Sequence, residues 1–214
     1  MEIQSYKIYF NDSALVIADS PDVVRGLDNL YFIGDDELQK SFKILLLSQH
    51  NGKPLHFALI CPDPESTIRQ FIDDFKVIQA AGGLVFNKEN QLLTIKRKGY
   101  WDLPKGKIER DEDQKTAALR EVMEETGITT INISDKICNT FHAYYEEDKL
   151  VLKQTHWFLM KSLGKGNLKP QVEEGISEVK FANLEWFNTP EFNSYQSVHD
   201  VLRSYSQNGI TTEG

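Results

Sequence analysis

Short apolar runs separated by turn signals open the chain and predict two hairpins. The runs Tyr6–Phe10 and Ala14–Ala18 flank a polar turn, so we expect them to pair as antiparallel strands. A second pair, Phe42–Leu47 and Leu55–Cys61, flanks the segment His50–Lys53. Its Asn-Gly step is a strong signal for a hairpin turn. Strands are therefore the expected structure of all four runs.

A helix is expected after Asp63, because this capping residue is followed by proline at the first helical position. The apolar residues that recur at helical spacing behind it are Ile68, Phe71, Ile72 and Phe75. Residues 1–76 thus predict a small N-terminal α/β domain. No motif with recognisable chemistry falls within it.

Residues 77–214 predict a second domain that begins with a strand hairpin, Val77–Phe86 and Gln91–Arg97. A loop leads to a strongly patterned helix at Asp113–Thr126. Further strands are expected at Ile137–Ala143, Leu150–Lys161 and Val179–Phe181. A final helix is expected from Thr189-Pro190, with an apolar face made by Phe192, Tyr195, Val198, Leu202 and Tyr205.

Composition and the start of the chain favour a cytoplasmic protein. The net charge of −8 argues against general nucleic-acid binding, so DNA is not an expected partner. The start of the chain has no secretory pattern, and no apolar run is long enough for a membrane span. Cys61 and Cys138 form no metal or disulfide motif, which fits a reducing compartment. A homodimer is left open.

Three glutamates concentrate on the helix at Asp113–Thr126. Glu121, Glu124 and Glu125 stand at i, i+3 and i+4, which places them on one helix face. Their mutual repulsion would be relieved by a hard divalent cation such as Mg²⁺. A solvated acidic face is the alternative interpretation of these three residues alone.

The surroundings of these glutamates favour the metal site. Arg120 can orient a carboxylate through its guanidinium fork, and Gly127 is suited to a left-handed helix stop. Upstream, Gly106 ends a basic loop, and its small size would let a backbone carbonyl approach a metal or phosphate.

Read whole, the stretch from Gly106 to Ile128 is GKIERDEDQKTAALREVMEETGI. It resembles the Nudix box, Gly-x5-Glu-x7-Arg-Glu-(apolar)-x-Glu-Glu-x-Gly-(apolar), at every fixed position. The residues in those positions are Gly106, Glu112, Arg120, Glu121, Val122, Glu124, Glu125, Gly127 and Ile128. The resemblance extends from about Gln79 to Phe187 and does not include the N-terminal residues.

The resemblance implies an α/β/α sandwich with a mixed sheet and a pyrophosphohydrolase activity that depends on Mg²⁺ or Mn²⁺. By that likeness Glu121, Glu124 and Glu125 bind the metal together with the Gly106 carbonyl. Arg120 would orient Glu121, and Glu112 would pair with Arg120. A further base or ligand often comes from a downstream loop, where Glu173, Glu174 and Glu178 are candidates; we favour Glu174.

The substrate suggested by the same likeness is a diadenosine polyphosphate. The stretch WDLPKGK, Trp101–Lys107, is similar to the approach to the box in hydrolases of diadenosine and diphosphoinositol polyphosphates. The strand HWFLM, His156–Met160, adds to this likeness. A tyrosine that could stack on a base is expected at Tyr144 or Tyr145. The basic residues suited to a polyphosphate chain are Arg97, Lys98, Lys105 and Lys107.

Other activities stay open from the sequence. Within enzymes, the alternatives are hydrolysis of (d)NTPs or NDP-sugars, of diphosphoinositol polyphosphates, or of RNA 5′ ends. Outside enzymes, a ligand-sensing regulator built on a Nudix-like domain is an alternative. Such a regulator would be expected to lose carboxylates of the box, which is intact here.

Overall fold

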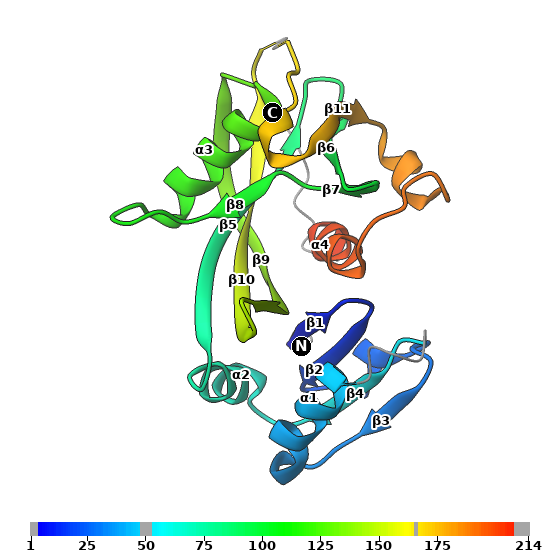
Figure 1. Cartoon of the computed structure of the whole chain (residues 1–214). Coiled ribbons are helices and arrows are strands. Elements are labelled where there is room, and N and C mark those ends of the chain that lie inside the picture. The colour runs from blue at the N-terminus through cyan, green and yellow to red at the C-terminus, as the bar shows by residue number, and fades with distance from the viewer. Residues whose placement is uncertain (1–3, 48–52, 165–166, 208–214) are drawn as a thin grey trace. The chain divides into compact units, whose positions relative to one another are not determined.

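The computed structural model describes residues 4–47, 53–164 and 167–207. The chain divides into two compact units (Figure 1). Unit 1 comprises Met1–Ile78 and Thr140–Gln154, and unit 2 comprises Gln79–Asn139 and Thr155–Gly214. No helix among the described residues is both long and apolar enough to cross a membrane.

Unit 1 is built on strands that pair in both directions. β1 (Ser5–Phe10) and β2 (Ser13–Ala18) form the predicted antiparallel hairpin. β4 (His56–Ile60) lies parallel to β2, and β3 (Leu30–Phe32) lies parallel to β4. The 3₁₀ helix η1 (Pro21–Val24) lies between β2 and β3 in the chain.

Two helices complete unit 1, and one of them corrects the sequence prediction. Phe42–Leu47 is not a strand: it belongs to α1 (Leu38–Leu47), which follows the short η2 (Asp35–Glu37). The buried positions of α1 recur at helical spacing: Leu38, Ser41, Phe42, Leu45 and Leu46. The Asn-Gly turn expected at residues 51 and 52 lies outside the described residues.

The second helix of unit 1, α2, spans Pro64–Ile72 as predicted, and Asp63 caps it by accepting a hydrogen bond from the Ser66 amide at 2.9 Å. Phe75 lies beyond the end of this helix but packs on the same core.

Unit 1 also takes in the tip of a long hairpin made by β9 (Ile131–Glu146) and β10 (Lys149–Ser162). β1 pairs parallel with β9, with Ile8 opposite Phe141. Phe141, Ala143 and Leu152 belong to the same buried cluster as the helices α1 and α2. Residues 140–154 therefore supply part of the unit 1 core.

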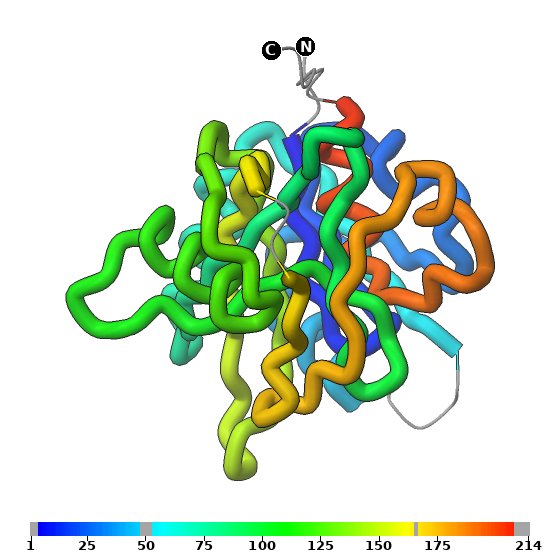
Figure 2. The backbone as a smooth tube through the Cα atoms, turned by 90° about the horizontal axis from the view of Figure 1, so that it is seen from above, coloured from blue at the N-terminus to red at the C-terminus, as the bar shows by residue number. Residues whose placement is uncertain are grey.

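Unit 2 is organised around β5 (Lys76–Phe86), which begins at the junction of the two units. β6 (Leu92–Arg97) pairs antiparallel with β5, as predicted, and β11 (Ile176–Ala182) pairs antiparallel with β6 (Figure 2). Two short strands pair with β5 and β6 outside the main strand order. β7 (Tyr100–Asp102) pairs with β6, and β8 (Lys105–Lys107) pairs with β5.

Helices cover both faces of the unit 2 sheet, which confirms the predicted α/β/α sandwich with a mixed sheet. On one face, α3 (Gln114–Thr126) packs through Val122 against residues such as Val85 and Phe158. On the other face, α4 (Gln196–Gln207) packs through Val201. The strand residues that it contacts alternate along the chain with Val85 and Phe158, which face α3. These strand residues are Leu84, Phe86, Trp157 and Leu159.

The final helix begins later than the sequence predicts. Thr189-Pro190 does not start it, because Thr189 ends the 3₁₀ helix η5 (Leu184–Asn188). The Thr189 hydroxyl donates to the Trp186 carbonyl at 2.8 Å and does not cap α4. Phe192 and Tyr195 consequently precede α4, although Phe192 is buried in the same core as that helix.

The two cysteines show no sign of a functional role. Neither forms a disulfide, and Cys61 is buried in unit 1. Burial raises the pKa of the Cys138 thiol to about 12, so this thiol stays protonated and unreactive at neutral pH.

Candidate active site

A short loop and α3 form the frame of the site in unit 2. β8 holds the loop against β5, with Gly106 opposite Ala81. Asp113 caps α3 by accepting hydrogen bonds from the amides of Lys115 and Thr116 at 2.8 and 3.0 Å. Gly127 ends the helix in the left-handed region, with φ of 76°. The helix therefore begins and ends where its sequence predicts.

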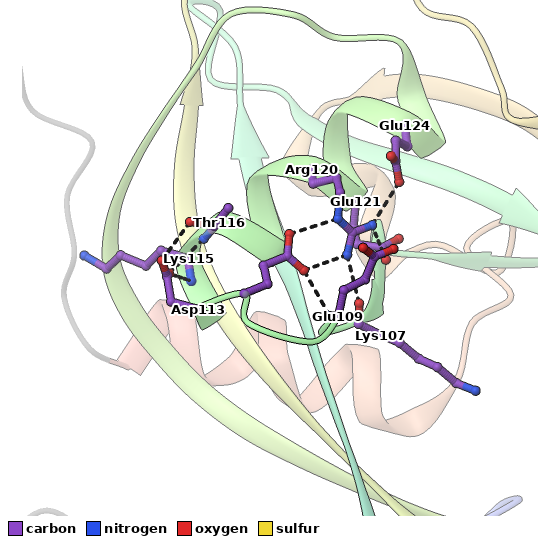
Figure 3. A network of polar contacts seen from close by, with 9 residues as sticks. Lys107, Glu109, Asp113, Lys115, Thr116, Arg120, Glu121 and Glu124 are labelled. Atoms are coloured by element: carbon purple, nitrogen blue, oxygen red, sulfur yellow. Dashed lines mark hydrogen bonds and ion pairs between the residues drawn. The ribbon is translucent and has the colours of Figure 1, made fainter.

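Arg120 is the centre of a hydrogen-bond network on α3 (Figure 3). Its Nε and Nη2 atoms donate to the two carboxylate oxygens of Glu112, each at 2.9 Å. Its Nη1 atom donates to Glu121 at 2.9 Å and to Glu124 at 3.0 Å, and Nη2 also reaches the Lys107 carbonyl at 2.9 Å. One guanidinium thus joins three carboxylates and the loop.

The network shifts the pKa values of its members. Hydrogen bonds from Arg120 lower the pKa of Glu112, and bonds to Glu112 raise the pKa of Arg120. Burial raises the pKa of Glu121, although the hydrogen bond from Arg120 opposes that rise.

Gly106 lies directly against the Glu121 carboxylate. A Cβ atom built on Gly106 would come within 2.0 Å of a Glu121 oxygen. Real side chains never approach so closely, so only glycine lets the loop backbone and this carboxylate share the space. Glu121 itself is buried, with 7% of its surface exposed.

Glu125 is the most deeply buried carboxylate of the site, at 0% exposure. Its Oε2 accepts a hydrogen bond from the Lys105 amide at 2.8 Å, and its Oε1 has no hydrogen-bond partner. The nearest cation to Oε1 is Arg97, whose Nη1 lies 4.0 Å away. Burial raises the pKa of Glu125 to about 7, so its carboxyl group is held between its charged and neutral forms.

The residues present fit a divalent cation. A buried oxygen without a partner, as on Glu125, is costly unless a ligand satisfies it. Gly106 has no side chain to fill the space beside the Glu121 carboxylate, and carboxylate oxygens are donors that hard cations prefer. Within the described residues no three His, Cys, Asp or Glu side chains are grouped as a ready-made metal site. Arg120 donates hydrogen bonds to both Glu121 and Glu124.

Two of the basic residues expected to bind phosphate are engaged with acids of the site. The Lys105 ammonium pairs with Asp102, Nζ to Oδ2, at 2.5 Å. Its pKa is raised: burial alone would lower it, but Asp102 and Glu125 outweigh burial. Arg97 lies between Glu125 and Glu174, with its Nη1 3.6 Å from the Glu174 carboxylate. Glu174 lies on η4 (Val172–Glu174). The Arg97 guanidinium therefore lies near both Glu174 and Glu125, which is a candidate metal ligand.

The other predicted binding residues are Lys98, Lys107, Tyr144 and Tyr145. Lys98 is exposed in the turn between β6 and β7, and Lys107 is exposed, with its side chain extending away from Arg120 (Figure 3). Tyr144 and Tyr145 belong to unit 1, where the Tyr145 ring packs edge-on against Phe10 at 6.2 Å. Their part in substrate binding stays a prediction.

The sequence interpretation missed the role of Asp102. It is the single acid in the basic loop, and that contrast is the signal that could have indicated a buried ion pair. His156 is buried, and its two ring nitrogens lie within hydrogen-bonding distance of Asn139 and Gln79, at 2.9 and 2.7 Å. Both ring nitrogens of His156 are therefore engaged with neighbouring side chains.

A protein-family model matches the part of the chain that contains this loop and α3. The family model described as NUDIX domain matches residues 76–203. The chain belongs to the Nudix family. It is therefore a Nudix hydrolase, and the loop and helix from Gly106 to Ile128 are its Nudix box.

Several curated proteins resemble this Nudix hydrolase. An RNA pyrophosphohydrolase of Pelagibacter ubique is 30% identical over 121 residues, which cover 50% of this chain and 73% of the relative. A putative 8-oxo-dGTP diphosphatase of Bacillus subtilis is 28% identical over 137 residues, 63% of this chain and 87% of the relative. Among solved structures, a C. elegans Ap4A hydrolase complex superimposes with a TM-score of 0.49 at 24% identity, covering 61% of this chain and 96% of that one.

Proposed function

We propose that this Nudix hydrolase cleaves a phosphoanhydride bond of a nucleoside-linked polyphosphate in a reaction that requires Mg²⁺ or Mn²⁺, with diadenosine polyphosphates as the first candidates. The observation that carries the proposal is Glu125, a fully buried carboxylate with one unsatisfied oxygen beside Glu121 and Gly106. A merely solvated acidic helix face would leave all three glutamates in water.

Glu121, Glu124, Glu125 and the Gly106 carbonyl would hold the metal. When bound, a divalent ion supplies charge neutralisation of the pyrophosphate and a lowered pKa for an attacking water. The chain contributes the positions of its ligands. The Lys105 amide fixes one Glu125 oxygen, and Arg120 fixes the carboxylates of Glu121 and Glu124.

Glu174 is our candidate for the group that accepts a proton from the attacking water. It lies 3.6 Å from Arg97, is partly exposed, and is close enough to Glu121 to raise the pKa of that carboxyl. An exposed carboxylate beside a buried acidic cluster can take up a proton and pass it to solvent. Arg97 would keep Glu174 turned toward the cluster as a positioning residue.

The charge of the loop that precedes the box supports the proposed substrate class. Residues 96–107 carry five basic residues and one acid, and the Asp102–Lys105 pair neutralises one of these charges. Arg97 is also engaged, with Glu125 and Glu174. The excess of basic over acidic residues in this loop favours an extended anionic chain, and it suits three or more linked phosphates better than a single pyrophosphate. Diadenosine polyphosphates have this character.

RNA 5′-triphosphate ends are the second candidate, because three curated relatives at 28–30% identity are named RNA pyrophosphohydrolases. Glu121, Glu124 and Glu125 would bind the metal in the same way for this substrate. A long RNA differs from a dinucleotide in extending well beyond the site, and the net charge of −8 disfavours a long polyanion.

The test is product analysis after incubation of the purified full chain with Mg²⁺ or Mn²⁺. The panel contains diadenosine tri-, tetra- and pentaphosphate, 5′-triphosphorylated RNA, 8-oxo-dGTP, a diphosphoinositol phosphate and ADP-ribose. We expect the highest kcat/KM for the diadenosine series, with a nucleoside triphosphate among the products of the longer members. ADP-ribose cleaved faster than the diadenosine series would contradict the proposed substrate.

Glu174→Gln tests the role of the downstream acid. We expect kcat to fall by about a hundredfold or more with little change in KM, because a proton acceptor acts in the transition state. Glu185→Gln is the matched control, since Glu185 is an exposed glutamate in the same unit on η5. Equal rates for the wild type and Glu174→Gln would remove Glu174 from the mechanism.

A further inference from the structure

Two exposed tyrosines stack on each other in unit 2. The rings of Tyr100 and Tyr195 lie 5.0 Å apart with planes inclined by 25°. Each residue is about two-fifths exposed, at 41% and 40%. Large aromatic side chains that gather at a surface commonly mark a place where a ligand is bound. The pair comes from segments far apart in the sequence, so the fold has brought the rings together.

The strand register places Tyr100 on the same side of the sheet as the charged residues of the site. Tyr100 lies directly opposite Arg97, and Asp102 lies opposite Ile95. Because side chains alternate along a strand, Arg97, Tyr100 and Asp102 share one face. Directly opposite residues have Cβ atoms about 5 Å apart. The Cβ atom of Tyr100 therefore lies close to that of Arg97, the residue whose guanidinium is 4.0 Å from Glu125 and 3.6 Å from Glu174.

The two residues before Tyr195 bond to Trp101, the neighbour of Tyr100. The Trp101 amide donates to the Asn193 carbonyl at 2.9 Å, and the Ser194 hydroxyl donates to the Trp101 carbonyl at 2.6 Å. Asp102, Lys105 and Arg97 all act electrostatically on the Tyr195 hydroxyl. Tyr195 is thus held beside the same charged residues that surround Glu125.

We propose that Tyr100 and Tyr195 form a stacking subsite for the nucleobase of the substrate, with the polyphosphate directed past Arg97 toward the carboxylates. This subsite rests on the proposed function, because it assigns the base of a nucleoside polyphosphate. A purine is the expected occupant, since its larger π face extends the stack further. The two rings are already ordered by each other, so binding a base costs little side-chain entropy.

The rival explanation is that the two rings form only a structural contact, called a clasp here, that packs β7 against the segment before α4. Stability and affinity separate the two explanations. A clasp would lower the melting temperature when either ring is removed and leave affinity for the base unchanged. A subsite would weaken binding of a ligand with a base and leave binding of a ligand without a base unchanged.

The experiment is a stopped-flow titration of the full chain with 2-aminopurine riboside triphosphate and Mg²⁺, read before turnover. Stacking on an aromatic ring quenches the fluorescence of this base. We expect Tyr195→Ala and Tyr100→Ala each to raise the Kd roughly tenfold or more and to reduce the quenching. Tyr195→Phe should keep both values, because it keeps the ring. Competition by inorganic tripolyphosphate should give the same affinity in all variants.

Tyr31→Ala is the matched control, since Tyr31 is an exposed tyrosine on β3 of unit 1. An unchanged Kd and unchanged quenching in both alanine variants would overturn the subsite, whatever the substrate panel shows. Tyrosine-dependent quenching without turnover on that panel would instead keep the subsite and remove the proposed hydrolysis. Turnover that is insensitive to both tyrosines would keep the hydrolysis and remove the subsite.

Discussion

The Lys105 amide donates a hydrogen bond to one oxygen of Glu125, while the second oxygen of that buried carboxylate has no hydrogen-bond partner. The loop thus positions the carboxylate and leaves one coordination position unused. A group with this arrangement is suited to receive a cation and to lose its proton as it does so.

Replacement of Glu125 by glutamine should abolish most activity without unfolding the chain. The amide oxygen can still accept from Lys105, but the negative charge that would bind the metal is lost. We expect kcat to fall at least about a hundredfold, with a melting temperature equal to or above that of the wild type. Glu124→Gln should lower kcat similarly. Near-normal rates in folded variants would contradict the assignment of these glutamates as metal ligands.

Arg120→Ala should lower both stability and activity. It removes the partner of Glu112, Glu121 and Glu124 at once and leaves partly buried carboxylates unpaired. Loss of such a partner costs about 2–4 kcal/mol of unfolding free energy. Urea unfolding measures this cost, with Arg25→Ala as the control, because Arg25 forms an exposed pair with Asp22. Equal losses for the two variants would show that the Arg120 network is not stabilising.

Gly106→Ala should disrupt the site through a single methyl group. The added Cβ would overlap the Glu121 carboxylate, which would have to leave its bond to Arg120. We expect kcat to fall at least roughly tenfold, since misplacement by an ångström is costly in catalysis. Gly164→Ala is the matched control, because the nearest atom to its added Cβ is 3.8 Å away. Comparable kinetics for both alanine variants would show that Glu121 tolerates displacement.

His156 predicts a specific dependence of stability on pH. Burial, aided by Lys136, lowers the pKa of this histidine to about 4, against an ordinary value of 6.5. The unfolded chain binds the proton more tightly, so the contribution of His156 is complete above pH 6.5 and declines as pH falls toward 4. Between pH 7 and pH 5 the loss is about 2 kcal/mol. His156→Gln should flatten this part of the profile in urea unfolding; an unchanged slope would contradict the assignment.

Removal of residues 1–75 should expose apolar surface rather than free an intact second unit. Phe141 and Leu152 would lose the unit 1 core into which they pack. We expect the shortened chain to bind the dye ANS more strongly and to melt at a lower temperature than the full chain. A soluble fragment with the melting temperature of the whole chain would show that the tip of the β9–β10 hairpin needs no partner.

The parts of the fold that the sequence predicts well are those with one dominant pattern. The hairpin of β1 and β2 and the helix α3 have clear turn or capping residues and came out as expected. The run Phe42–Leu47 was mistaken for a strand because its apolar residues are nearly continuous. The helical spacing becomes visible only when Leu38 and Ser41 are included.

The candidate site shows the same limit. The spacing of Glu121, Glu124 and Glu125 predicts a shared helix face, and Arg120 is predicted to orient a carboxylate. In the structure Arg120 donates hydrogen bonds to Glu121 and Glu124. The pairing of Lys105 with Asp102 was not predicted, because a basic loop read as sequence does not show which ammonium is buried. The meeting of Tyr100 and Tyr195 depends on the tertiary fold alone, and no local pattern indicates it.

The parallel pairing of β1 with β9 also affects synthesis of the chain. Ile8 leaves the ribosome early, whereas its neighbour Phe141 leaves only after the Nudix box has been made. The first unit therefore cannot close its core while it is the only part translated, although amino-terminal domains usually fold first. During translation β1 therefore has no partner on one side until the β9–β10 hairpin has left the ribosome.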